Sequence, residues 1–273
     1  METAVSGQVR FPMTKAAFAA FRQAAGRYRA VVDGLNAALP ELPALIQRLV
    51  DQRDGPSYTV DTPVLYNLAL DEYTPDSEVK LILAADNPGR REQAAENRRY
   101  LVGPSGKIAE RFFRDHPELG IDFRRHVLIL NKTPIHTPRT AELKALCRLG
   151  GPRIAGAVVS SQRTMAELLL EFWQILAGSS PGGFPGVPVW IIGYSEMKKG
   201  GLFEAYTGRL KELCAANPAF RDSLFLYRHF SMNQFTIDLK RRSPPPLTDG
   251  EPEEGLEQRL RRVGAAYRER VLG

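Results

Sequence analysis

The sequence predicts a three-layer α/β/α fold with a mainly parallel central sheet, preceded by N-terminal helices and followed by a C-terminal helix. Short runs that are apolar at nearly every position alternate with stretches of helical spacing. Continuous apolar runs are typical of strands buried on both faces, and their alternation with helices indicates a parallel sheet covered on both sides. The chain of 273 residues is long enough for one such domain. Its strands are too few for an eight-stranded barrel.

The elements follow in order along the chain. Apolar side chains recur at helical spacing in residues 14–36 and 41–52, so the N-terminal fifth is expected to be helical. The apolar runs expected to form strands are 79–85, 126–131, 155–160, 187–193 and 224–227. Helical spacing between them predicts helices at about 104–115, 139–149, 162–177 and 202–216.

Two stretches rich in Gly, Ser and Pro, residues 178–186 and 243–252, are expected to be loops. We therefore expect one α/β domain at 1–242 with its helical part at about 1–55, a proline-rich linker at 243–255 and a C-terminal helix at 256–273. That helix has arginines beside an apolar stripe. It could dock on the domain or lie on phosphates.

Composition and charge exclude several classes of protein for this chain. Lys and Arg number 37 and Asp and Glu 31, a net charge of +6 that is compatible with a polyanionic partner. The 2 cysteines exclude a four-cysteine iron–sulfur site and a disulfide framework. No apolar run approaches the ~20 residues of a membrane span, and the first residues lack a signal-peptide pattern. We expect a soluble, cytoplasmic protein, associated with the nucleoid in a prokaryote.

Polar side chains stand where several expected strands end. The first strand is followed by Asp86-Asn87-Pro88-Gly89, the second ends in Asn131, and the last leads to His229. Ligands of open α/β sheets bind at the carboxyl ends of the strands, so we expect these side chains to share one site. The alternatives are an ordinary Asn-Pro turn and a structural histidine.

The segment Tyr-Leu-Val-Gly-Pro-Ser-Gly-Lys at 100–107 opens an expected helix. Its glycines could let the backbone approach a planar ligand or a phosphate. Their spacing matches neither the P-loop nor the dinucleotide fingerprint, which disfavours a nucleoside triphosphate site. The sequence also has no nucleophile elbow and no metal-ligand motif.

In order and context, these motifs resemble those of the uracil-DNA glycosylase superfamily. Asn-Pro-Gly at 87–89 is similar to the mismatch-specific and single-strand-selective monofunctional branches, and Val-Gly-Pro-Ser-Gly at 102–106 to the thermostable branch. The resemblance covers about residues 79–235 and implies a four-stranded parallel sheet. The sequence departs from the family pattern at Ala85 in place of Gly, at Leu101 in place of a stacking Phe, and at Phe230 in place of Pro.

The resemblance implies that Asn87 and His229 are catalytic. Breaking an N-glycosidic bond collects negative charge on the departing base, which the N–H of a neutral His229 could stabilise, while Asn87 orients the attacking water. Asn131 has the donor and acceptor to match uracil O4 and N3–H, while a flipped amide would match cytosine, so a neighbour must fix its orientation. Gly89 leaves room for a C5 substituent. The expected substrate contacts are Asp86, Gly89, Tyr100, Leu101 and Asn131.

DNA must release the target base from the stack before this chemistry can occur. Met232 and Asn233 are placed to enter the vacated gap, with simple packing as the alternative for Met232. Further DNA contacts are expected from Lys107, Lys132, Ser231 and Arg241, with Arg90, Arg91, Arg98, Arg99, Lys240 and Arg242 nearby.

These observations predict a monofunctional DNA glycosylase that removes uracil or a related deaminated base in base excision repair. We expect a monomer with DNA as its partner, no cofactor and no metal. Strand cleavage is not expected, because no lysine suited to a lyase step stands at a motif. The alternatives are a nucleic-acid-binding protein of the same fold that has lost catalysis, and a nucleoside hydrolase.

Overall fold

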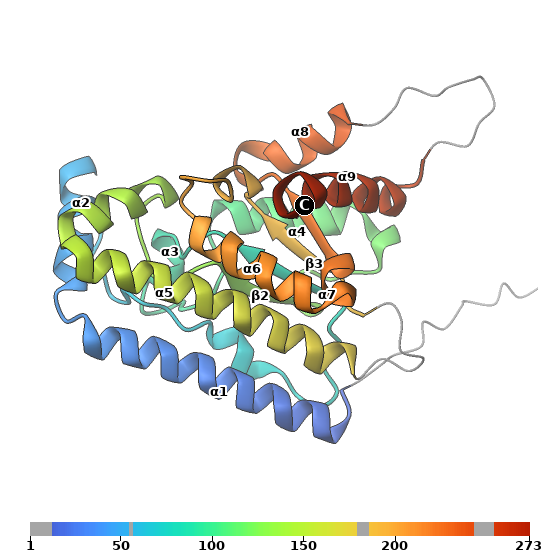
Figure 1. The fold of residues 1–273 in the computed structure, drawn as a ribbon, viewed down its shortest axis with the longest axis horizontal. Coiled ribbons are helices and arrows are strands. Elements are labelled where there is room, and N and C mark those ends of the chain that lie inside the picture. The colour runs from blue at the N-terminus through green and yellow to red at the C-terminus, as the bar shows by residue number, and fades with distance from the viewer. Residues whose placement is uncertain (1–12, 55–56, 179–185, 243–253) are drawn as a thin grey trace, which may run out of the picture.

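The computed structural model describes residues 13–54, 57–178, 186–242 and 254–273 (Figure 1). It contains a four-stranded, all-parallel sheet in the order β2-β1-β3-β4. The strands are β1 (Leu81–Ala85), β2 (Val127–Asn131), β3 (Val189–Ile192) and β4 (Leu224–Tyr227). Every residue of these strands is buried, as strands covered on both faces should be. The expected α/β/α fold is confirmed.

Helices flank the sheet on both sides, with α5 and α6 in front of it and α4 behind it in Figure 1. The described helices are α1 (Lys15–Ala38), α2 (Leu42–Asp54), α3 (Arg90–Gln93), α4 (Pro104–Asp115), α5 (Leu143–Ala177), α6 (Glu204–Ala216), α7 (Pro218–Ser223), α8 (Gln234–Arg241) and α9 (Leu256–Leu272). Short 3-10 turns are η1 (Leu68–Glu72), η2 (Pro117–Leu119), η3 (Thr140–Glu142), η4 (Tyr194–Glu196) and η5 (Ser231–Asn233).

The expected strand at 155–160 is wrong, because these residues belong to α5. The buried side chains Ile154, Val158 and Ser161 are spaced as one face of a helix. A short apolar run cannot be told from a buried helical segment by hydrophobicity alone. The helices expected at 139–149 and 162–177 lie in two helical segments of α5, which meet at Gly151, where φ 66° and ψ −164° are not helical, directly before Pro152.

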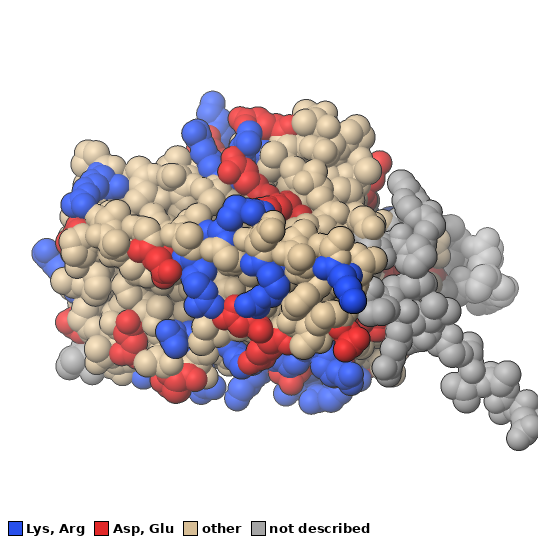
Figure 2. Space-filling model, turned by 90° about the horizontal axis from the view of Figure 1, so that it is seen from below, with Lys and Arg blue, Asp and Glu red and all other residues tan. Residues whose placement is uncertain are grey.

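The N-terminal helices pack beside α5 as a further layer. Phe21 of α1 lies edge-on to Phe172 of α5, with ring centroids 5.2 Å apart. The outer side of α1 is polar, and Arg27 pairs with Glu171 of α5. Figure 2 shows the molecule from this side, with Lys and Arg interspersed among Asp and Glu. This face therefore carries no extended patch of one sign.

The C-terminal helix α9 packs on β4. Tyr227 of β4 donates a hydrogen bond to the Leu260 carbonyl at 2.9 Å, and Tyr267 stacks on Tyr194 with ring centroids 4.0 Å apart. The tail helix therefore docks on the domain. The proline-rich stretch 243–253, the glycine-rich loop 179–185 and residues 1–12 lie outside the described residues.

Across the described ranges, no helix is both long enough and apolar enough to cross a lipid bilayer.

Candidate functional site

The carboxyl ends of the four strands bring the expected site residues to one edge of the sheet. Asn131 at the end of β2 is paired in register with Ala85 at the end of β1, directly before Asp86 and Asn87. His229 follows β4 on the other side of β3. The parallel topology thus gathers chemistry-bearing residues from β1, β2 and β4, as the strand-end argument predicts.

A buried ion pair lies beneath this edge. Lys132 Nζ is 2.6 Å from Asp86 Oδ1 and also donates to the Ile192 carbonyl. Gly193 follows Ile192 with φ 84°, and a Cβ there would overlap the Asp86 carboxylate. Both the left-handed backbone and the close approach of Asp86 therefore require glycine at this position. Burial lowers the pKa of Lys132, while the Asp86 carboxylate opposes that shift.

The expected DNA contact by Lys132 is wrong. Its side chain is 0% exposed, so its ammonium cannot reach a phosphate outside the fold. A side chain that follows a strand end can point into the protein or away from it, and the sequence does not distinguish the two. Asp86 Oδ1 accepts a hydrogen bond from Lys132, so this carboxylate oxygen belongs to the ion pair.

Asn87 is half-buried with its amide orientation fixed. Its Nδ2 donates to Thr137 Oγ1 at 2.9 Å and to the Ile135 carbonyl at 3.2 Å. Thr137 donates its own hydroxyl proton to the Arg139 carbonyl, so Thr137 can only accept from Asn87. Within the described residues no hydrogen bond uses Asn87 Oδ1, which leaves that oxygen as an acceptor for a water.

His136 supports the same loop, although no sequence motif selects it. Its Nδ1 lies 2.7 Å from the Pro88 carbonyl and its Nε2 lies 3.1 Å from the Tyr58 hydroxyl. Only a protonated Nδ1 can donate to a carbonyl, so Nε2 accepts from Tyr58. Burial lowers the pKa of His136 to about 4. The imidazole is therefore neutral at pH 7 and anchors the Asn-Pro-Gly turn.

Glu92 is a second residue that the sequence motifs do not indicate. Its carboxylate accepts from the Gly89 backbone N–H at 2.9 Å and from the backbone of Leu101. It thereby links the two loops that carry the first two motifs. Burial raises the pKa of Glu92 to about 7, and these backbone donors and Arg124 oppose the rise.

Gly89 itself is half-buried, and a Cβ built on it would meet nothing within 4 Å. Open space beside this residue agrees with the expectation that the turn leaves room for a substituted base. The role itself stays a prediction.

Tyr100 does not suit the expected substrate contact. It is buried, and its hydroxyl donates to the Leu65 carbonyl at 2.7 Å and contacts the Tyr28 hydroxyl. Tyr100 lies against a groove beside β2, together with Val102, rather than at the strand-end site. The expectation for Tyr100 is wrong because an aromatic residue next to a motif is as easily part of the core.

Leu101 is buried with φ 53° and is not part of that groove. A Cβ on Gly106 would overlap the Leu101 carbonyl. The glycine therefore lets the start of α4 approach its own preceding loop, not a ligand. A stacking role for Leu101 stays a prediction.

Asn131 is buried beside the ion pair. Among the described residues its Nδ2 has no hydrogen-bond partner. A buried amide N–H without a partner costs roughly 1–3 kcal/mol. The nitrogen is itself buried, so a ligand carbonyl would recover that cost only after neighbouring groups move aside.

His229 has a defined tautomer. Its Nδ1 accepts from the Ser231 backbone N–H at 3.1 Å and lies 2.9 Å from the Ser231 hydroxyl. Because an N–H points at Nδ1, the ring proton of the neutral imidazole resides on Nε2. Burial lowers the pKa of His229; Asp86 raises it and Lys132 lowers it further. The site thus offers a neutral N–H donor, and Ser231 serves to orient the ring.

Met232 and Asn233 are exposed residues of the turn η5, which begins two residues after this histidine. Both have left-handed backbone, with φ 51° and 56°, and Met232 is 79% exposed. Packing in the core is therefore excluded for Met232. An exposed methionine on left-handed backbone is suited to contact a partner. Its insertion between DNA bases stays a prediction.

The remaining expected DNA contacts lie on the surface. Lys107 and Arg241 are exposed. Several flanking arginines are engaged elsewhere: Arg99 forms two hydrogen bonds with Glu72, and Arg90 donates to the Ser57 carbonyl. Their proximity in sequence does not by itself make a phosphate track.

In the described ranges no group of three or more His, Cys, Asp and Glu side chains is arranged to hold a metal ion. No family model matches the chain, and no curated protein or solved structure matches it.

Proposed function

We propose that the protein is a DNA glycosylase of the uracil type, which hydrolyses the N-glycosidic bond of uracil or a related deaminated base. The observation that carries the proposal is the tautomer of the neutral His229 ring, which has its proton on Nε2. Ser231 holds Nδ1 as an acceptor, so the ring presents Nε2–H at the carboxyl edge of the sheet. A neutral N–H donor at that place can hydrogen-bond the departing base and stabilise the negative charge that develops on it.

The reaction follows from the donors and acceptors at the edge. A water whose proton points at Asn87 Oδ1 adds to the anomeric carbon of the sugar. The bond between that carbon and the base nitrogen breaks with its electron pair on the base, and His229 Nε2–H hydrogen-bonds the base oxygen where charge collects. The second proton of the water is released to solvent, and the departing base anion takes up a proton from solvent, so the products are a free neutral base and an abasic sugar.

Asn131 is the proposed reader of the base. Its unpartnered Nδ2 would donate to a carbonyl such as uracil O4. Cytosine has an amino group at that position, and two donors facing each other would leave Asn131 unsatisfied. With Nδ2 facing the base the amide favours the deaminated base over its parent, whereas a flipped amide would match cytosine.

Strand cleavage is not part of the proposal. A lyase step needs a free amine that attacks the sugar. The Lys132 amine is enclosed and bonded to Asp86 and the Ile192 carbonyl, which makes it a fixed charge beneath the site rather than a nucleophile.

The test is incubation with a single-stranded oligonucleotide containing one uracil, followed by alkali to cut abasic sites, with free nucleosides assayed in parallel. We expect cuts only after alkali, and no release from nucleosides. Release from nucleosides alone would favour a nucleoside hydrolase. Tight binding without any abasic site would favour a binding protein that has lost catalysis.

A further inference from the structure

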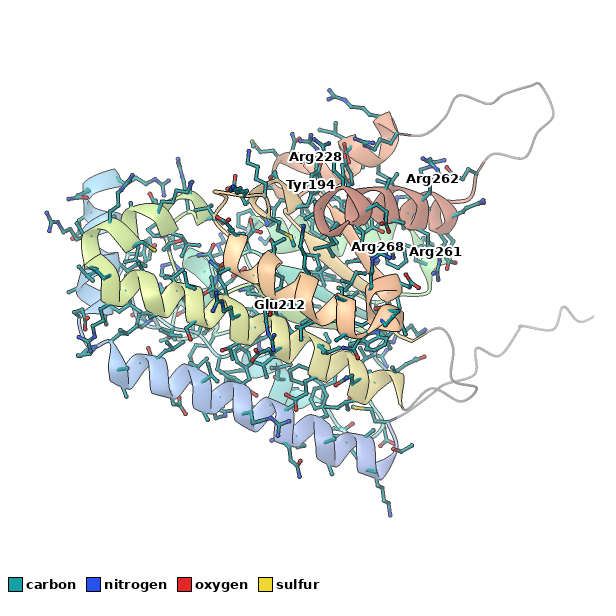
Figure 3. All side chains as sticks on the ribbon, viewed as in Figure 1. Tyr194, Glu212, Arg228, Arg261, Arg262 and Arg268 are labelled. Carbon is teal, nitrogen blue, oxygen red and sulfur yellow. The ribbon has the colours of Figure 1, made fainter. Side chains whose placement is uncertain are left out.

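A second recess opens beside the candidate site, between η4, α6 and the end of α9. It has a volume of about 640 Å³ and is lined by polar and charged side chains of all three elements. Two of its residues adjoin the site directly: Tyr194 follows Gly193, which contacts Asp86, and Arg228 precedes His229. Figure 3 shows Tyr194 and Arg228 close together beside α9.

The charge of this recess is strongly one-sided. Its lining contains the cations Lys198, Lys199, Lys211, Arg228 and Arg270, and one carboxylate, Glu204. Glu204 is engaged with the Gly200 backbone N–H at 2.9 Å, and Arg228 has Asp238 at 3.4 Å.

The other cations of the recess have no such partners. Within the described residues, Lys198, Lys199, Lys211 and Arg270 form no ion pair and no side-chain hydrogen bond. The contrast with the rest of α9 is informative, because its other arginines each have an acidic neighbour: Glu254, Glu257 or Glu269. Arg270 is the arginine of α9 whose charge is left for a ligand.

The recess is held in shape by its surroundings. Tyr267, one turn before Arg270, stacks on Tyr194 and donates to Asp238 at 2.7 Å. Arg268 donates to the backbone carbonyls of Arg221 and Asp222. The end of α9 is therefore fixed against η4 and α7, and Arg270 stands at a defined place opposite α6.

We propose that this recess, which we call the α9 pocket, binds phosphate groups of the nucleic-acid strand whose base enters the strand-end site. Unpaired cations around a concave wall suit phosphate oxygens. The strand is favoured over a free phosphorylated molecule because two residues of the lining, Tyr194 and Arg228, directly adjoin Gly193 and His229 in the chain. This inference rests on the proposed function and gives α9 a part in it.

The test compares two double charge reversals with equal change in net charge. Lys211→Glu with Arg270→Glu alters the pocket, and Lys15→Glu with Arg48→Glu alters exposed cations on α1 and α2, helices at the opposite edge of the molecule from α9 (Figure 1). Affinity for a single-stranded oligonucleotide without uracil is measured by fluorescence anisotropy at several salt concentrations. Lys211→Gln with Arg270→Gln, and melting temperatures of all variants, control for folding.

We expect the pocket reversal to weaken binding at least tenfold more than the control reversal. The slope of log affinity against log salt should flatten by about 0.7 for each phosphate of the single strand that the pocket no longer neutralises. Equal weakening by both reversals would overturn the proposal.

Inorganic phosphate and a mononucleotide provide the second arm. If either raises the melting temperature of the parent protein through the pocket while oligonucleotide binding is unaffected by the reversal, the ligand is a free phosphorylated molecule and the strand is excluded. Excision of uracil is measured separately. A parent protein that binds through the pocket but releases no base would refute the proposed function and leave this inference standing.

Discussion

At the scale of single residues, the chemistry of the site depends on which of its atoms are already engaged. Asn87 gives both amide protons to acceptors, Thr137 and the Ile135 carbonyl. His229 accepts a hydrogen bond at Nδ1 from the Ser231 backbone N–H. These hydrogen bonds decide which atom of each side chain is left to face a substrate. They can be tested by substitutions that keep the shape of the side chain but exchange donor and acceptor atoms.

Asn87→Asp is such a substitution. The carboxylate would place an oxygen against the Ile135 carbonyl, which cannot donate, and against Thr137 Oγ1, which can donate only by giving up its bond to the Arg139 carbonyl. We expect a loss of about 1–3 kcal/mol in the free energy of unfolding, and excision as slow as in Asn87→Ala. Urea unfolding and a single-turnover excision assay measure the two quantities. Excision at or above the parent rate would show that Asn87 is held differently.

Glu92 predicts a pH dependence of stability. Its folded pKa of about 7 exceeds the usual 4.5, so its contribution is full below pH 4.5 and is lost as the pH rises through 7. Relative to Glu92→Gln, the parent should lose on the order of 3 kcal/mol in free energy of unfolding between pH 4.5 and pH 8. Urea titrations at both pH values measure it.

The comparison with Glu92→Gln also separates Glu92 from His136. The lowered pKa of His136 acts in the opposite sense, because stability from the neutral ring is lost as the pH falls from 6.5 towards 4. His136 is present in both proteins and cancels. A constant difference between parent and variant across this range would mean that Glu92 is ionised throughout.

The motifs predicted where Asn87, Asn131 and His229 would meet, because strand ends of a parallel sheet share an edge. They could not predict the residues behind them. His136 and Glu92 act through backbone groups of Pro88, Gly89 and Leu101, and such contacts have no sequence spacing. Lys132 and Tyr100 were assigned wrongly since burial at a strand end depends on neighbouring elements.

At the scale of elements, the turn η5 predicts a selective effect of Met232. If the exposed side chain fills the gap left by a flipped base, Met232→Ala should slow excision from duplex DNA about tenfold or more and leave single-stranded DNA nearly unaffected, since only the duplex has a stack to open. Parallel excision assays on matched substrates measure this. Equal slowing on both would remove the wedge role.

The contact between α9 and β4 depends on Gly264. A Cβ there would lie 2.6 Å from Phe225 Cβ and 2.7 Å from the Tyr227 hydroxyl, so α9 must shift. We expect Gly264→Ala to lower the free energy of unfolding by about 1–3 kcal/mol. Gly26→Ala on α1, where a Cβ meets nothing within 4 Å, is the control and should be stabilising by about 0.5 kcal/mol. A neutral or stabilising Gly264→Ala would mean that α9 packs less closely.

Element boundaries followed from the sequence where periodicity was long, as for α4 and α9, and failed at α5. There the apolar residues at 155–160 suggested a strand between two helices, at about 139–149 and 162–177. The structure has two helical segments there, which meet at the non-helical backbone of Gly151, and residues 155–160 belong to the second segment.

At the scale of the whole molecule, the order of the strands determines where the site, the groove and the α9 pocket lie. The strand-end site lies at the carboxyl edge, the groove beside β2 lies along the other flank, and the α9 pocket adjoins β3 and β4. The face over α1 has mixed charge (Figure 2). We therefore expect a nucleic-acid strand to cross the carboxyl edge of the sheet towards α9.

The central claim is that this edge breaks an N-glycosidic bond through His229. The most direct measurement is the single-turnover rate of free uracil release from a single-stranded oligonucleotide by the parent and by His229→Ala, with the affinity of each for that oligonucleotide. We predict release by the parent, a rate lower by on the order of 10²-fold in the variant, and affinities within about twofold of each other. No uracil release by the folded parent, or an undiminished rate in His229→Ala, would contradict it.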